Sequence, residues 1–163
     1  YGRNHRFVFA TKNIENLKGI PEEDWQYGEN ASWLYYLFPN VQLGGGGHDA
    51  NLIKIYPDPK NPGRSITKVN HYFSQEFIDY VSQVPDDGKS AYDKDRNPSL
   101  DGVVEVFDTT IEQEDYLMGE TTQKSAETGI VKEFIFGRNE PALHHYHNTF
   151  REALNLPPLE KVG

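Results

Sequence analysis

The sequence predicts an α+β fold, in which a group of strands is followed by a group of helices. The first 80 residues carry short β-rich runs separated by strong turn signals, and the rest carries mostly helical spacing of apolar side chains. A chain of 163 residues can bury roughly two thirds of its unfolded surface around one core. We therefore expect a single domain over residues 1–163.

The first strands are expected before residue 57. Residues 6–10 form a short β-rich run, and residues 13–25 are expected to connect it onward through a helical turn. Residues 32–43 are dense in Trp, Leu, Tyr and Phe on both alternating faces, which predicts one strand covered on both sides. Four glycines at 44–47 then predict a flexible hairpin connection to a strand at 51–56.

The last strand of this group is expected at residues 66–73, where side chains of two kinds alternate along the chain. Before it, Pro62 is followed by Gly63, the pairing that a type II turn requires. Because the connections have hairpin length, the strands are expected to form an antiparallel meander.

Two helices and a loop are expected in the middle of the chain. Ser74 is placed to cap a helix that includes Phe77, and the polar residues 86–98 are expected to be a surface loop. A long helix is expected to begin near Leu100 and end before Gly129. Its apolar stripe has spacings of four and seven residues: Val103, Phe107, Ile111, Met118 and Thr122.

The C-terminal part predicts one more helix. Residues 130–136 are apolar and β-branched, and are expected to be a strand or an extended segment. A helix then opens at Pro141 and carries Leu143, His147, Phe150 and Leu154 on one face, until Pro157 and Pro158 stop it.

The composition excludes several kinds of site and partner. The chain has no cysteine, so disulfides, thiolate zinc sites, cysteine nucleophiles and thiolate-held iron–sulfur clusters are excluded from it. Its 16 basic and 25 acidic residues give a net charge of -9, which disfavours nucleic acid and anionic membranes as partners. The longest apolar run is residues 33–38, far below the ~20 residues that span a bilayer. With no signal-peptide pattern at the start, a cytoplasmic protein is expected.

Two acids lie at the margins of the apolar stripe on the predicted long helix. Glu114 and Asp115 flank the stripe when residues are placed 100° apart. An acid there is partly desolvated unless it is paired, hydrogen-bonded or bound to a metal. The simpler alternative is that one or both reach solvent at the edge of the stripe. Periodicity does not choose between the two acids.

The six histidines offer weaker signals. Glu140, His144 and His147 share a face of the last predicted helix, a set that zinc or iron could use. His147 also lies on the apolar stripe, which favours an interior histidine instead, whereas His145 is expected to face water. His71 is expected inside a pocket or the core. The 21 aromatic residues are mostly expected in the core and sheet, and would also suit a pocket for a flat apolar ligand.

Three parts of the chain carry a resemblance to a known family: the string YYLFPN at residues 35–40, the strand and turn at 56–65, and the helix at 112–123 followed by residues 136–147. Together they resemble the α subunit of Rieske-type, non-haem iron, aromatic-ring-hydroxylating oxygenases. The resemblance implies a helix-grip fold, with a curved antiparallel sheet packed on a long C-terminal helix. It also implies that Asp115 is the carboxylate ligand of a mononuclear Fe(II), as part of a 2-His-1-carboxylate triad.

The chain departs from this family in two respects. The family's two histidine ligands come from a Tyr-His-x-x-x-x-His string, whereas the one Tyr-His here, at Tyr146 and His147, is followed five residues later by Glu152. The [2Fe-2S] cluster of the Rieske domain needs cysteines. We therefore expect the chain to be the C-terminal part of an oxygenase catalytic domain, with the Rieske domain and the histidine segment upstream.

The resemblance implies ring hydroxylation of an aromatic or similarly apolar substrate, as in aromatic compound catabolism. The other reactants would be O₂ and electrons from NAD(P)H, delivered by a ferredoxin or reductase. The parent is expected to be a homo-oligomer or an αβ hetero-oligomer, and the isolated chain is expected to bind iron weakly and be inactive. One alternative is a non-catalytic helix-grip module that binds an apolar ligand. Another is a catalytically silent domain for subunit assembly.

Overall fold

A computed structural model describes residues 2–25 and 27–161. The chain divides into two compact units, one formed by Tyr1–Tyr72 with Ile135–Gly163 and the other by Phe73–Phe134. The first contains a sheet and the last helix, and the second contains the remaining long helices. No helix among the described residues is long and apolar enough to cross a membrane. The organisation of residues 1–163 as one domain stays a prediction.

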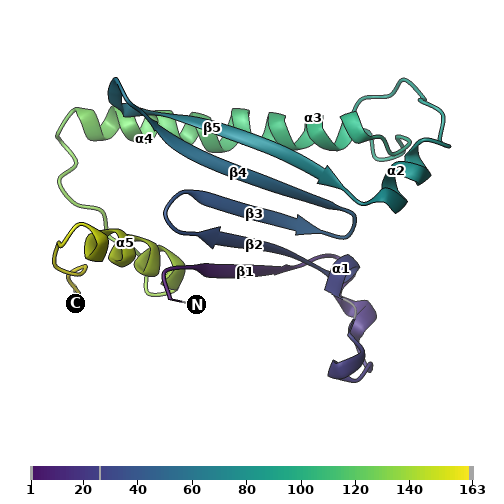
Figure 1. Cartoon of the computed structure of the whole chain (residues 1–163), viewed down its shortest axis with the longest axis horizontal. Helices are drawn as coiled ribbons and strands as arrows, with labels where there is room; N and C mark the ends of the chain where they lie inside the picture. Colours follow the sequence, from purple (N-terminus) through teal and green to yellow (C-terminus); the bar gives the residue numbers. More distant parts are fainter. Residues whose placement is uncertain (1, 26, 162–163) are drawn as a thin grey trace. The chain divides into compact units, whose positions relative to one another are not determined.

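The first unit is built on a five-stranded meander in the order β1-β2-β3-β4-β5 (Figure 1). The pairings of β1 with β2, β2 with β3 and β3 with β4 are antiparallel, with His5 opposite Tyr36, Leu37 opposite Val41 and Gly46 opposite Asp49. The α+β class and the antiparallel meander are therefore confirmed. The strands are β1 (His5–Ala10), β2 (Ala31–Leu37), β3 (Val41–Gly46), β4 (Asp49–Asp58) and β5 (Asn61–Phe73).

The prediction of one strand over residues 32–43 is wrong. The aromatic run breaks at residues 38–40, which turn the chain from β2 into β3. Pro39 has no backbone N–H to donate to a ladder. The side chain of Asn40 donates to the carbonyl of Ile55 at 2.8 Å, and the Tyr36 hydroxyl bonds the carbonyl of Pro39. The aromatic run of β2 is followed closely by Val41 and Leu43 of β3, and the two strands therefore look like one in the sequence.

The glycine run is mostly strand, not linker. Only Gly47 and His48 lie between β3 and β4, with Gly47 at φ 61°, where a residue without a side chain is favoured. Gly45 pairs with Trp33, whose indole crosses it. A Cβ at Gly45 would lie 2.9 Å from that ring and 2.8 Å from the carbonyl oxygen of Asp49. Glycine is required there because the indole occupies the space of a side chain.

The chain before β2 and after residue 135 completes this unit. Short helical turns η1 (Ile14–Leu17) and η2 (Glu22–Asp24) precede α1 (Tyr27–Asn30), which confirms the expected helical connection. The last helix, α5 (Pro141–Ala153), begins with its proline in the first turn, as predicted. It ends before the two prolines, with Asn155 at φ 55°.

Helix α5 packs on β1 and β2 through paired rings. Tyr36 lies 5.0 Å from Tyr146, and Phe38 lies 5.0 Å from Phe150, between ring centroids. Tyr36 is only 8% exposed. The buried apolar side chains among the described residues all belong to this unit: Leu17, Ala31, Tyr36 and Ile53.

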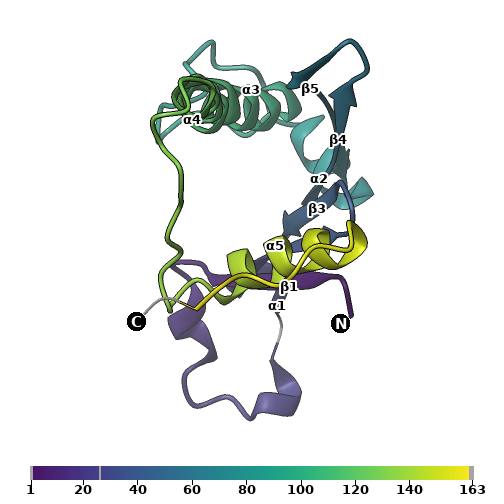
Figure 2. The same cartoon turned by 90° about the vertical axis from the view of Figure 1, so that its left-hand side faces the viewer.

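The second unit begins with α2 (Gln75–Val81), capped by Ser74, whose hydroxyl accepts from the Phe77 amide at 3.2 Å. After the loop at 82–99, helical structure runs without a break through α3 (Leu100–Thr110), η3 (Ile111–Tyr116) and α4 (Leu117–Glu127). Figures 1 and 2 show these three segments as one rod.

This rod confirms the helix expected from Leu100 to before Gly129. It is not the last helix of the chain, because α5 follows it. Residues 130–136 form no strand, and Ile130 and Ile135 are 81% and 78% exposed.

Candidate functional site

Asp115 lies in a π-helical turn inside the long rod. Residues Ile111–Tyr116 (η3) form this turn, and the flanking residues Thr110 and Leu117 keep ordinary helical angles of φ -62°, ψ -48° and φ -60°, ψ -42°. A π-turn widens the helix locally, and such turns are rare and concentrated at functional sites. The backbone therefore marks the segment that contains Asp115.

Both candidate acids are exposed. Glu114 and Asp115 lie in a stretch, residues 112–128, in which every residue is exposed, whereas Ile111 just before it is half-buried. Of the two sequence-based alternatives, the structure has the simpler one, in which the acids reach solvent. Nothing in their own helix desolvates either carboxylate.

The apolar stripe of the rod is covered at one end only. In α3, Val103, Val106 and Phe107 are half-buried. At the end of the π-turn and just after it, Tyr116, Leu117 and Met118 are 42%, 55% and 64% exposed. Next to Asp115 the rod therefore presents uncovered apolar side chains, and contiguous apolar surface of this kind is typical of interaction sites.

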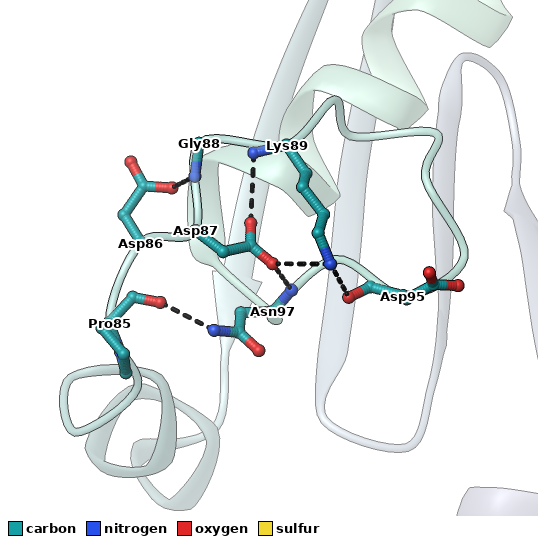
Figure 3. A network of polar contacts seen from close by, with 7 residues as sticks. All are labelled: Pro85, Asp86, Asp87, Gly88, Lys89, Asp95 and Asn97. Atoms are coloured by element: carbon teal, nitrogen blue, oxygen red, sulfur yellow. Dashed lines mark hydrogen bonds and ion pairs between the residues drawn. The ribbon is translucent and has the colours of Figure 1, made fainter.

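The loop at 82–99 is held by a polar network around Asp87 (Figure 3). The Asp87 carboxylate accepts from the backbone amides of Asn97 at 2.9 Å and Lys89 at 3.1 Å. The Lys89 ammonium lies 3.5 Å from Asp87 and donates to the carbonyl of Asp95 at 2.9 Å. The Asn97 amide, with help from Lys89, lowers the pKa of Asp87. The loop is therefore held together by its own side chains.

A pocket of about 290 Å³ lies where this loop meets α3. The Arg96 guanidinium lines it, donates to the Ser99 hydroxyl at 2.9 Å, and occupies the space above Gly102. Val103 and Val106 form its apolar wall. No aromatic residue lines this pocket, so it does not suit the flat apolar ligand considered above.

The unit that contains Asp115 has no histidine, since all six lie outside residues 73–134. In α5, His147 stacks on Phe136 at 4.6 Å, and its pKa is lowered by burial and by Arg151. These contacts are those of an interior histidine. Within residues 2–25 and 27–161, no three His, Asp or Glu side chains form a group that could hold a metal ion.

The expectation that His145 faces water is wrong. Its ring meets the ring of His5 edge to face, with centroids 5.5 Å apart and planes at 87°. His5 in turn stacks on Tyr36 at 4.9 Å. The sequence signal that could have identified His5 is its alternation with Phe7 and Phe9 along one strand, which places the three side chains on the same face.

The sequence model of the family described as "Ring hydroxylating alpha subunit (catalytic domain)" matches residues 7–156 of the 163. The chain belongs to this family. The resemblance found in the sequence is thereby confirmed, and the family supports a ring-hydroxylating oxygenase role in general. Searches of curated proteins and of solved structures found no match.

The family implies non-haem iron in its catalytic domain, which requires side chains that can ligate the metal. A facial triad takes two imidazoles and one carboxylate. Asp115 can supply an exposed carboxylate, but its unit offers only further carboxylates, Glu112 and Glu114 among them. The described residues therefore do not by themselves fit a complete iron site.

Proposed function

We propose that this chain is part of the catalytic domain of a Rieske-type oxygenase, and that Asp115 is its carboxylate ligand for mononuclear Fe(II). When bound, such an iron supplies the activation of O₂ beside an aromatic or similarly apolar substrate. The observation that carries the proposal is the place of Asp115 in a π-turn, within the part of the chain that the family match covers. No step of the reaction is assigned to other residues of this chain.

The histidine ligands are proposed to come from a segment outside this chain. The support is the residue pattern: the one Tyr-His of this chain, at Tyr146 and His147, is followed five residues later by Glu152, so the family's Tyr-His-x-x-x-x-His string does not occur in it. A Rieske domain with its [2Fe-2S] cluster would likewise come from outside, because its thiolate ligands need cysteines and this chain has none.

The helix-grip arrangement is part of the same proposal. In it, the long rod of α3, η3 and α4 would pack on the five-stranded sheet, with the substrate between them. The exposed Leu117 and Met118 beside Asp115 support this, since an apolar surface of that kind is usually covered in the complete protein. Electrons would come from NAD(P)H through a ferredoxin or reductase, in a homo-oligomeric or αβ parent.

The experiment is substrate-dependent O₂ uptake by the full-length protein with its reductase, over a panel of aromatic compounds. Hydroxylated product should form in proportion to NAD(P)H oxidised. Asp115→Asn should lower this turnover at least about a hundredfold, the size of loss typical for an essential catalytic group. Glu114→Gln is the matched control, because Glu114 is the neighbouring acid in the same turn and is also exposed.

Full turnover by Asp115→Asn, with product formed as in the wild type, would contradict the role of Asp115. It would favour the assembly alternative, in which this domain is catalytically silent. Binding of an aromatic compound without O₂ uptake by any variant would favour the ligand-binding module.

A further inference from the structure

The helix α5 is joined to the sheet by three ring pairs, of which one consists of two histidines. His5 is the first residue of β1 and meets His145, while Tyr36 of β2 meets Tyr146. Phe38 and Phe150 form the third pair. The histidine pair is the part of this joint that can change charge between pH 5 and 8.

Each of the two imidazoles has a nitrogen that is enclosed without a hydrogen-bond partner. These atoms are Nδ1 of His5 and Nε2 of His145. A neutral imidazole can leave one nitrogen as an unprotonated acceptor, whereas a protonated ring has an N–H on both nitrogens. Protonation would place a charged donor at an enclosed position with no acceptor, which costs more than burying a neutral ring.

Within the part of the chain that the structure describes, the side chains in ring contact with His5 include no acid. Tyr36 stacks on it from β2, Phe7 touches it from its own strand, and His145 faces it from α5. Burial, and then the His145 ring, lower the pKa of His5 from its ordinary value of 6.5. Burial also raises the pKa of Tyr36, with a contribution from Tyr146, so the hydroxyl stays neutral near pH 7.

A charged pair bridges the same two segments at the surface. Arg3 lies 3.6 Å from Glu152 of α5, with side chains 51% and 71% exposed. An exposed pair of this kind contributes little to stability. The acid response of the joint is therefore assigned to its histidine pair and not to this ion pair.

We propose that the contact between His5 and His145 is an acid-sensitive joint, which holds α5 on the sheet near neutral pH and releases it on protonation. The sign follows from linkage. Because the pKa of His5 is lower in the folded state, the folded state binds fewer protons than the unfolded state as the pH falls through 6.5. The joint therefore contributes its whole stabilisation above pH 6.5, and this contribution decreases below that pH. The strand ladders of β2, β3 and β4 contain no part of the joint's histidine pair and should persist.

The test is amide hydrogen exchange of the whole chain between pH 7.5 and 5.0, corrected for the intrinsic pH dependence of exchange. Protection of α5 amides should fall at least about tenfold relative to the protection of β2 and β3 amides. The double variant His5→Phe, His145→Phe keeps two rings but cannot titrate, and should retain most of the α5 protection at pH 5.0. His48→Gln, at an exposed turn, should behave like the wild type.

A loss of α5 protection in the double variant that equals the wild-type loss would overturn the proposal. It would point to His147, whose lowered pKa acts in the same direction, and His147→Phe then identifies that source. If the double variant does not fold, the wild-type NMR titration decides. His5 must titrate below 6.5, and an ordinary or raised value would also overturn the proposal.

Discussion

The rings of Tyr36 and Tyr146 lie 5.0 Å apart at 64°, and this pair joins β2 to α5. Tyr36 is 8% exposed, and its hydroxyl bonds the carbonyl of Pro39 in the turn to β3. One side chain therefore connects a helix, a strand and a turn of the first unit.

Replacing Tyr36 tests this connection. Tyr36→Ala should lower the free energy of unfolding by about 3 kcal/mol, because it removes a buried ring and leaves a cavity. Tyr36→Phe should lose only about 1 kcal/mol, the net contribution of one hydrogen bond. Urea unfolding measures both. Tyr72→Ala is the control, since Tyr72 is 53% exposed, and an equal loss there would refute the assigned role.

Gly45 and Gly119 should respond to alanine in opposite ways. Gly45→Ala places a Cβ 2.8 Å from the Asp49 carbonyl oxygen and 2.9 Å from the Trp33 ring, and should destabilise by about 1–3 kcal/mol. Gly119 lies in α4 with nothing within 4 Å, so Gly119→Ala should stabilise by about 0.5–1 kcal/mol. Thermal unfolding of the two variants would contradict this account if both moved in one direction.

The hydroxyl of Ser99 caps the long rod. It accepts from the Gly102 amide at 3.1 Å and from Arg96 at 2.9 Å. Ser99→Ala should cost about 1 kcal/mol, the usual contribution of an N-cap. Ser99→Asp should keep most of it, because aspartate also caps. A Ser99→Ala protein with an unchanged urea midpoint would show that the cap does not contribute.

Replacing Asp49 by Asn should give a gain in stability that depends on pH. Burial raises its pKa, and nearby His71 and His48 only partly oppose this. A raised folded-state pKa means that stability is full below the unfolded value and is lost as the pH rises through the folded value. Asp49→Asn should therefore be more stable than the wild type at pH 7, with the difference vanishing near pH 3. The exposed Asp95→Asn serves as control, and a gain from Asp49→Asn that did not change with pH would be inconsistent with burial of the charge.

Local signals predicted the elements well where one residue decides the structure. Ser74 marked a helix start and Pro141 another, because caps and prolines act through the adjacent backbone. The sequence does not reveal the break between β2 and β3, since apolar residues continue on both sides of Pro39. The π-turn at Asp115 has no pattern of its own in residue type, so only backbone geometry reveals it.

The sequence predicted the interior face of α5 only in part. Phe150 packs on Phe38 and His147 on Phe136, as predicted, whereas Leu143 and Leu154 are 40% and 64% exposed. The sheet also meets His145 and Tyr146, and Thr149 is 5% exposed. Which face of an amphipathic helix is covered depends on its partner, here the rings of His5 and Tyr36, and these come from residues far away in sequence.

The central claim is that Asp115 holds the mononuclear iron of a ring-hydroxylating oxygenase. The most direct measurement is the iron content of the full-length protein, with the visible absorption of the [2Fe-2S] cluster recorded as a check on folding. Asp115→Ala should lose the mononuclear iron and keep the cluster, while Glu114→Ala should keep both. Mononuclear iron retained at wild-type stoichiometry in Asp115→Ala would contradict the account.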